Sequence, residues 1–304
     1  MIINENTLTT LFTMFNDALA RGLEMADVSW QNWAMTITSG QSLERYPMLV
    51  LLSTMREWIG PRQFNSFKAQ YLQVINRDFE HSIAVPTNTI EDDQLGLFPV
   101  AFQQMGMDAT QLWPDIGTDA LIANAEWLDG TAFFAAARTL NGNTINNYTT
   151  DALSATTFTT AYDLMIAYAG YNGKPLGVKP MYLMVGPSNR TVAHGIVNTA
   201  AGGATAVNAN EGLVEIIINP YLIGDYSEYW YILADRGAVK PVLMQQRKMG
   251  ALIALDKPTD ATVFLGTTGG EDGNIPGGVN AYGIHYRGEA ALTLPPLAYG
   301  GFAT

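Results

Sequence analysis

The stretch that decides the fold spans residues 89–127 and reads TIEDDQLGLFPVAFQQMGMDATQLWPDIGTDALIANAEW. Its apolar residues from Phe98 to Ile116 recur three or four positions apart, which places their side chains on one face of an α-helix. Pro114 lacks a backbone donor and predicts a kink or break, after which a second helical piece continues through Ala123 to Trp127. At about 1.5 Å per residue, this segment spans several tens of ångströms, which is longer than a small domain needs.

The beginning of this stretch carries its own signals. Thr89 and Asp92 are spaced like a capping box, and the triplet Glu91-Asp92-Asp93 lies where the helix dipole favours negative charge. Adjacent residues on a helix point in different directions. We therefore interpret the triplet as a solvated first turn, not as a metal or acid–base site.

The residues before the long helix divide into a helix and extended segments. Over residues 7–21 one helical face carries Leu8, Leu11, Phe12, Phe15 and Leu19. Asn6 is a candidate cap for this helix, and Gly22 is expected to end it. The period changes to two over residues 33–38, which predicts a strand. Residues 40–88 contain strand-like pieces at 71–78 and 79–85 without a compact core pattern, so we expect an extended hairpin or arm.

Helices and strands alternate in the second half of the chain. A polar, loop-like stretch at 130–150 is followed by helices at 156–169 and 188–198 and by strands at 181–185, 213–218 and 229–234. These elements predict a compact lobe over roughly 150–235. The last third, from 239 to 294, is rich in strands. The predicted class is α+β.

Composition narrows the functions that the chain can serve. Its 304 residues include no Cys, which excludes disulfides and Cys-ligated metal sites, and its formal charge of −12 argues against sequence-independent nucleic-acid binding. Only 14% of residues are charged, a low density that favours a surface partly covered by partners. The start lacks a basic and apolar leader, and no apolar run approaches the ~20 residues of a membrane span. We therefore expect a protein made and used in a cytoplasm.

No set of residues predicts catalysis, a metal or a cofactor. His81, His194 and His285 lack metal-ligand spacing. Ser188 does not complete a nucleophile elbow and is better explained as a helix N-cap. The glycine-rich loop 266–278 lacks the lysine of a phosphate-binding loop, and the basic residues between 236 and 248 are interpreted as paired or solvated charges. The glycosylation motif at Asn147 is interpreted as a chance match.

Three blocks of sequence are more specific than any of these features. The first is EWIGPR at 57–62, and the second joins Phe79-Glu80 to IEDDQLGL at 90–97 and FQQMG at 102–106. The third is LADRGAVKP at 233–241. Together they resemble the major head subunit of Mu-like phages and prophages, the gpT family. One departure is visible: the acidic, His-Pro-ending stretch that often follows Phe133-Phe134 in the family is replaced here by residues 136–139, which read AART.

The resemblance implies the tailed-phage major capsid fold, also called the Hong Kong 97-like fold. It divides the chain into an N-terminal arm with the first strand (1–39), an E-loop hairpin that reaches over a neighbouring subunit (40–88), a peripheral domain with the spine helix (89–149), an axial domain (150–235) and return strands of the peripheral domain (236–304). It also implies a major capsid protein that self-assembles into an icosahedral shell enclosing phage DNA, made in the host cytoplasm and located in the virion.

The partners implied by the resemblance are copies of the same chain in hexamers and pentamers, with scaffold, portal and decoration proteins. Double-stranded DNA is enclosed without sequence-specific binding, and no membrane is involved. Six residues are candidate inter-subunit contacts: Leu8, Phe12, Phe15, Trp58, Arg62 and Phe64. We expect Trp58 and Phe64 to pack on a neighbour, with a local hairpin core as the alternative.

A second hypothesis concerns the helix at 7–21. We expect it to dock only on assembly, because its apolar stripe is too large to be left in water. Two alternatives remain open for the whole chain. One is another virion component, such as a tail or decoration protein, and the other is a soluble hydrolase using Ser188 or a carboxylate pair.

Overall fold

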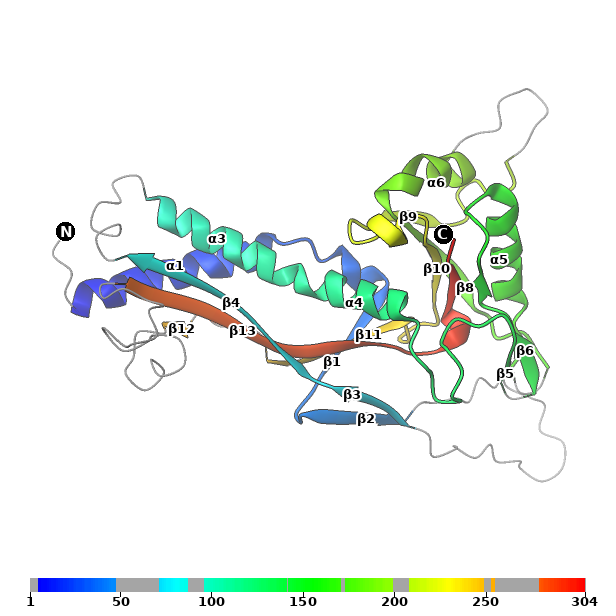
Figure 1. The fold of residues 1–304 in the computed structure, drawn as a ribbon, viewed down its shortest axis with the longest axis horizontal. Coiled ribbons are helices and arrows are strands. Elements are labelled where there is room, and N and C mark those ends of the chain that lie inside the picture. The colour runs from blue at the N-terminus through cyan, green and yellow to red at the C-terminus, as the bar shows by residue number, and fades with distance from the viewer. Residues whose placement is uncertain are drawn as a thin grey trace.

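The computed structural model describes residues 5–47, 71–86, 96–140, 142–170, 173–198, 208–248, 253–254 and 279–303. These residues form an elongated half and a lobe at one end of it (Figure 1). Helices α1, α3 and α4 run along a long sheet in the elongated half, whereas α5 and α6 lie against a second sheet in the lobe (Figure 1). The C-terminal end of the chain lies in the lobe (Figure 1).

The long sheet is organised around β13, which spans Val279–Leu292. On one side β13 pairs antiparallel with β4 (Arg77–Pro86) along the whole length of β4. On its other side it pairs antiparallel with β11 (Val242–Lys248) and β12 (Ile253–Ala254), and β1 (Ala34–Thr38) adds to β11 in parallel. The predicted strand at 33–38 is confirmed as β1, and the expectation of a strand-rich last third is confirmed for β11, β12 and β13.

The spine of the elongated half consists of two helices, α3 (Leu97–Thr110) and α4 (Leu112–Ala123). They are separated at Gln111, whose backbone N–H donates to the carbonyl of Asp108 at 3.1 Å. Pro114 occupies the first turn of α4, where its missing donor is tolerated, so the predicted break is confirmed. The predicted continuation to Trp127 is wrong, because Asn124 adopts a left-handed conformation (φ 42°) that ends α4. Residues 87–95, with the acidic triplet, lie outside the described residues.

Helix α1 (Glu5–Met25) is longer than the predicted helix at 7–21. The expectation that Gly22 ends it is wrong, because Gly22 is the point at which α1 crosses α3. A Cβ atom on Gly22 would overlap the backbone of Gln103, and one on Gly106 would overlap the backbone of Leu19. Two glycines therefore allow the helix backbones to approach closely. At the same crossing Phe15 stacks on Phe102, with ring centroids 4.3 Å apart.

A two-stranded hairpin leaves the long sheet on the side away from the spine (Figure 1). It pairs β2 (Leu43–Pro47) antiparallel with β3 (Tyr71–Ile75), from Leu43↔Ile75 to Pro47↔Tyr71. The segment 48–70 between these strands lies outside the described residues. The hairpin is narrower than the predicted range 40–88, because β4 pairs with β13 and belongs to the long sheet.

The sheet of the lobe has the order β7-β14-β10-β8-β9. Its strands are β7 (Tyr148–Thr149), β14 (Ala298–Gly301), β10 (Trp230–Asp235), β8 (Lys179–Val185) and β9 (Glu215–Ile218). Helices α5 (Ala155–Ala167) and α6 (Arg190–Val197) confirm the predicted helices, and Ser154 caps α5 in a capping box with Thr157. The structure differs from the predicted boundaries at β14, which returns to the lobe and not to the long sheet.

Short elements complete the described chain. The stretch 130–150, expected to be a loop, contains the small hairpin of β5 (Arg138–Leu140) and β6 (Asn143–Ile145) as well as β7. Four single turns of 3-10 helix are η1 (Ser29–Asn32), η2 (Pro187–Asn189), η3 (Gly224–Tyr226) and η4 (Pro295–Leu297).

The two halves are joined by the loop that follows α4. Asn147 is fully buried, and its Nδ2 faces the carbonyls of Phe133, Pro295 and Ala298 at 3.1–3.2 Å. Its Oδ1 accepts from the N–H of Ala135 at 2.9 Å. This side chain ties the loop to the turn before β14, so the motif at Asn147 has a structural explanation.

Candidate functional site: the hairpin root and the groove beside it

The hairpin leaves the long sheet at a cluster of polar side chains that we call the hairpin root: Ser39, Glu44, Tyr46, Asn76 and Gln245. The hydroxyl of Tyr46 donates to Oε1 of Gln245 at 2.7 Å, and Nε2 of Gln245 donates to Oδ1 of Asn76 at 2.7 Å. Nδ2 of Asn76 donates in turn to Oγ of Ser39 at 3.1 Å. Gln245, Ser39 and Asn76 are buried. Because buried polar groups are costly when unpaired, this network holds the hairpin at one orientation.

Glu44 completes the hairpin root on its exposed side. One carboxylate oxygen, Oε1, accepts from the backbone N–H groups of Gly40 and Gln41 at 3.0 and 3.1 Å and from the hydroxyl of Ser39 at 3.1 Å. The hydrogen bond from the N–H of Gly40 contributes most to holding the pKa of Glu44 below its ordinary value, and the bonds from Ser39 and Gln41 contribute less. The ionised carboxylate therefore fixes the turn that leads into β2.

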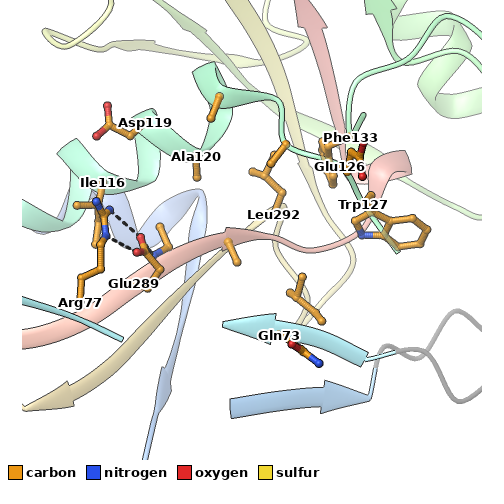
Figure 2. A pocket seen from close by; sticks show the side chains of 15 residues that line it. Gln73, Arg77, Ile116, Asp119, Ala120, Glu126, Trp127, Phe133, Glu289 and Leu292 are labelled. Atoms are coloured by element: carbon orange, nitrogen blue, oxygen red, sulfur yellow. Dashed lines mark hydrogen bonds and ion pairs between the residues drawn. The ribbon is translucent and has the colours of Figure 1, made fainter. Parts of the chain in front are cut away.

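A groove lies beside the hairpin root, between α4, β3, β13 and the loop 125–133 (Figure 2). We call it the spine groove; its volume is about 430 Å³. Its apolar lining includes Ala120, Ala123 and Leu292, and its exposed border carries Asp119 and Glu126. The small alanine side chains leave room above the sheet.

The charges in the spine groove divide into a paired and an unpaired set. Arg77 and Glu289 form a bidentate ion pair across β4 and β13 (Figure 2), which raises the pKa of Arg77. Asp119 and Glu126 form no ion pair with any side chain in the described part of the chain. The groove therefore presents an excess of negative charge.

The end wall of the spine groove is fixed by Trp127. Its Nε1 donates to the carbonyl of Thr293 at 2.7 Å, and the guanidinium of Arg138 lies 5.1 Å from the centre of its ring. Arg138 is 2% exposed and pairs with Asp129 at 3.0 Å. Burial lowers the pKa of Arg138, and Asp129 opposes that shift. Arg138 belongs to the stretch that departs from the family pattern, so the loop carries a buried cation at this position.

The structure places some of the predicted contact residues within the chain's own core. Phe15 on α1 is 1% exposed and contacts Phe102 on α3 and Tyr282 on β13. Phe12 is half-buried and stacks on Tyr282, with centroids 6.5 Å apart. α3 and β13 of the same chain thus cover the described part of the apolar stripe of α1, and docking of this helix only on assembly stays a prediction.

The other predicted contacts are not described. Trp58, Arg62 and Phe64 lie in the segment 48–70, outside the described residues, and the side chain of Leu8 is outside them as well. Their contacts stay predictions. The structure adds residues that sequence reasoning missed, above all Asn76 and Gln245 of the hairpin root. A polar residue within the strand-like piece 71–78 is the signal that could have pointed to Asn76.

The side chains considered for chemistry do not converge. His285 pairs with Asp78 at 3.0 Å on the long sheet, whereas His194 lies on α6 in the lobe. The interpretation of Ser188 as an N-cap is wrong, because Asn189 holds the cap position of α6 and no side chain bonds there. Within the described ranges, no group of three or more His, Asp or Glu side chains is arranged to hold a metal ion. No described helix is long and apolar enough to cross a bilayer.

Comparison with protein families gives two matches. The model of the Mu-like prophage major head subunit gpT matches residues 8–150, and the model of the phage capsid protein family matches residues 88–287. The two matches together extend from α1 into β13.

Two curated relatives match shorter stretches. The chain is 29% identical over 109 residues to the major capsid protein of Escherichia phage Mu, covering 36% of each chain. It is 22% identical over 163 residues to the Mu-like prophage FluMu major head subunit of Haemophilus influenzae, covering 51% of this chain and 53% of the relative. The chain thus spans between about a third and a half of the length of the curated relatives it matches.

Solved structures match over nearly the whole chain. The procapsid of bacteriophage JBD30 has a TM-score of 0.57 at 20% identity and covers 98% of this chain and 76% of that chain. The mature capsid of bacteriophage PhiM1 has a TM-score of 0.58 at 11% identity and covers 92% and 88%. At these identities the likeness establishes the fold, which is the Hong Kong 97-like fold of tailed-phage capsids, as the sequence predicted.

Proposed function

Because the chain belongs to the phage capsid protein family, we propose that it is the major capsid protein of a tailed-phage head and that its copies tile an icosahedral shell. The observation that carries the proposal is the family match over residues 88–287, which includes both the spine and the lobe. A shell subunit acts through many repeated contacts in closed symmetry, and each contact is modest on its own.

The hairpin is the element best suited to contact a neighbouring copy. Tyr71 and Ile75 lie on the outer face of β3 and are 48% and 62% exposed, whereas Val74 on the other face is buried. A two-stranded hairpin is marginally stable alone, so the hairpin is stabilised when another protein surface packs on its exposed apolar face. We propose that this face and the segment 48–70, with Trp58, Arg62 and Phe64, contact a neighbour.

The parts of the chain follow the roles that the resemblance implies, with two changed boundaries. We assign 43–75 to the E-loop hairpin and return β4 to the peripheral domain, because β4 pairs with β13. We assign the C-terminal segment with β14 to the axial domain. Leu8 and Phe12 remain proposed contacts on α1, whereas Phe15 serves the subunit's own core.

The proposed partners are copies of the same chain in hexamers and pentamers, together with scaffold, portal and decoration proteins. The shell encloses double-stranded DNA without reading its sequence, and the net charge of −12 supports weak repulsion from phosphate. The subunit is made in the host cytoplasm and becomes part of the virion.

Size-exclusion chromatography followed by negative-stain electron microscopy of the purified protein tests this proposal. We expect closed shells of uniform diameter. Tubes or small rings would instead favour a tail component, and a monomer at every concentration would refute self-assembly.

The hairpin contact is tested separately by the double variant Trp58→Ala and Phe64→Ala. We expect fewer and less heat-stable shells, because large aromatic side chains commonly dominate contact energy. Val192→Ala, on the exposed face of α6, is the matched control for loss of an apolar side chain. Shells of unchanged yield and stability would favour a local hairpin core.

A further inference from the structure

We propose that a group of aromatic side chains on the surface of the lobe forms a site for an organic cation, that is, an alkylammonium or guanidinium group. The side chains are Tyr148, Tyr226, Tyr229 and Phe302, and we call them the aromatic cluster. This inference goes beyond the proposed function and does not depend on it.

The order of the strands in the lobe brings three of these rings together. β14 lies between β7 and β10 in the sheet. Phe302 directly follows β14, Tyr229 directly precedes β10, and Tyr148 begins β7. The ring of Phe302 stacks on Tyr148, with centroids 5.3 Å apart, and meets Tyr229 edge-on, with centroids 4.9 Å apart. Residues from three parts of the chain therefore form one continuous aromatic surface.

The floor of the aromatic cluster is held by the core of the lobe. Phe302 packs edge-on against two buried rings, Phe134 and Tyr231, with centroids 5.4 and 5.8 Å apart. Its backbone N–H donates to the carbonyl of Thr149 at 2.8 Å. Gly300 leaves room for the ring, since a Cβ atom there would lie 2.6 Å from a ring carbon of Phe302. A surface that is already ordered loses little conformational freedom on binding.

The fourth ring belongs to the turn η3. Tyr226 is 40% exposed and meets Tyr229 edge-on, with centroids 5.4 Å apart. The N–H of Tyr229 donates to the carbonyl of Tyr226 at 3.1 Å, and the N–H of Tyr226 donates to the carbonyl of Ile223 at 3.2 Å. These bonds fix the two tyrosines relative to each other. Tyr148, Tyr229 and Phe302 are half-buried, so the aromatic cluster reaches the surface.

A negative charge lies beside the aromatic cluster. Asp225 precedes Tyr226 in η3, is exposed, and forms no ion pair with any side chain in the described residues. Burial raises the pKa of Tyr229, and Tyr226, Tyr148 and Asp225 raise it further, which places these polar groups close to one another. The faces of aromatic rings carry partial negative charge and attract cations. The carboxylate of Asp225 adds to that attraction.

The described residues do not supply the cation themselves. In the described part of the chain, guanidinium groups lie over Phe79 (Arg77) and over Trp127 (Arg138), both outside the aromatic cluster. A rigid aromatic surface beside an unpaired carboxylate is complementary to a group that is both apolar and positively charged. The cation comes either from a small molecule in solution or from a Lys or Arg side chain of a second copy of the chain.

Saturation-transfer NMR of the purified protein with tetramethylammonium tests the site. The uncharged tert-butanol, a compact molecule of similar shape, is the control ligand. We expect tetramethylammonium to bind and tert-butanol to bind about tenfold more weakly, because the alcohol lacks the charge that the rings and Asp225 attract. Equal binding of the two ligands would overturn the proposal.

Substitutions assign the binding to the aromatic cluster. Tyr226→Leu keeps an apolar side chain without the ring and should raise the dissociation constant of tetramethylammonium about fivefold, whereas Tyr226→Phe keeps the ring and should leave it unchanged. Asp225→Asn should raise it about threefold, since one exposed charge is removed. Tyr71→Leu, at an exposed tyrosine on β3, is the matched control. Unchanged binding in Tyr226→Leu, or an equal loss in Tyr71→Leu, would overturn the proposal.

The same titration on unassembled subunits and on shells distinguishes the two sources of the cation. Binding to both forms supports a free organic cation. Binding to the subunits alone supports a basic side chain of a second copy, which then occupies the aromatic cluster in the shell. Binding to neither form overturns the site and leaves the proposed function intact. Failure of the chain to form shells bears on the proposed function only, because binding to the subunit is measured separately.

Discussion

The crossing of α1 and α3 depends on Gly22 and Gly106, and adding one methyl group to either tests it. A Cβ on Gly22 would overlap the carbonyl oxygen of Gln103 and lie 2.8 Å from its carbonyl carbon. A Cβ on Gly106 would overlap the carbonyl oxygen of Leu19 and lie 2.9 Å from the nitrogen of Leu23. Carbon atoms pack at about 3.5–4.0 Å, so the two helices must separate by roughly 1 Å.

The sign of the change in the free energy of unfolding distinguishes an effect on packing from an effect on helix propensity. Replacing Gly by Ala inside a helix stabilises it by about 1 kcal/mol when nothing else changes. Overpacking costs about 1–3 kcal/mol, and overlap with rigid backbone belongs at the upper end of that range. We therefore expect Gly22→Ala and Gly106→Ala each to lower the free energy of unfolding by about 2 kcal/mol net.

Gly195 is the matched control, because it lies in α6 and a Cβ there meets nothing within 4 Å. Gly195→Ala should raise the free energy of unfolding by about 1 kcal/mol. Urea unfolding of the purified subunits, followed by circular dichroism, measures all three variants. If Gly22→Ala and Gly106→Ala stabilise the subunit as Gly195→Ala does, then α1 does not rest on α3.

Three further predictions concern polar side chains that hold loops and turns by hydrogen bonds. Gln245→Ala removes the partner of the Tyr46 hydroxyl and of Oδ1 of Asn76, and should lower the free energy of unfolding by about 1–3 kcal/mol. Hydrogen exchange should become faster in β2 and β3 but not in α5, and an equal increase in all three elements would contradict a local role for the hairpin root. Asn147→Ala removes the hydrogen-bond partner of several buried backbone groups. It should lower the free energy of unfolding in urea by about 3 kcal/mol or more. A decrease of less than about 1 kcal/mol would show that other contacts hold the loop. Because the folded pKa of Glu44 is lowered, its contribution to stability is complete above the ordinary value of about 4.3 and is lost as pH falls through the folded pKa. Protection of residues 39–47 against hydrogen exchange, relative to the intrinsic rate at each pH, should therefore fall in acid. Glu44→Gln should abolish that pH dependence.

Local signals predicted the elements that local chemistry decides. The proline at 114 broke the spine helix as expected, and the alternation at 33–38 became β1. The prediction at Gly22 was wrong because a glycine in a helical pattern usually indicates the end of the helix. Here the missing side chain lets the backbones of α1 and α3 approach closely, and the sequence alone does not indicate that contact. The burial of Phe15 has the same origin, since its partners Phe102 and Tyr282 are distant in sequence.

The candidate site was predicted in outline only. Strand-like pieces at 71–85 indicated an extended hairpin, but their division at Asn76 depends on hydrogen bonds to Ser39 and Gln245, which no spacing rule connects. The spine groove is likewise formed by elements from three parts of the chain. Its end wall depends on Arg138, whose burial is unexpected for a charged residue in a polar stretch.

The most direct test of the account is an electron cryo-microscopy map of the particles that the purified chain forms, at a resolution that traces the hairpin from β2 to β3. We expect a closed icosahedral shell in which each hairpin crosses to another subunit. A particle of a different symmetry, or a subunit whose residues 48–70 cover only its own surface, would contradict it.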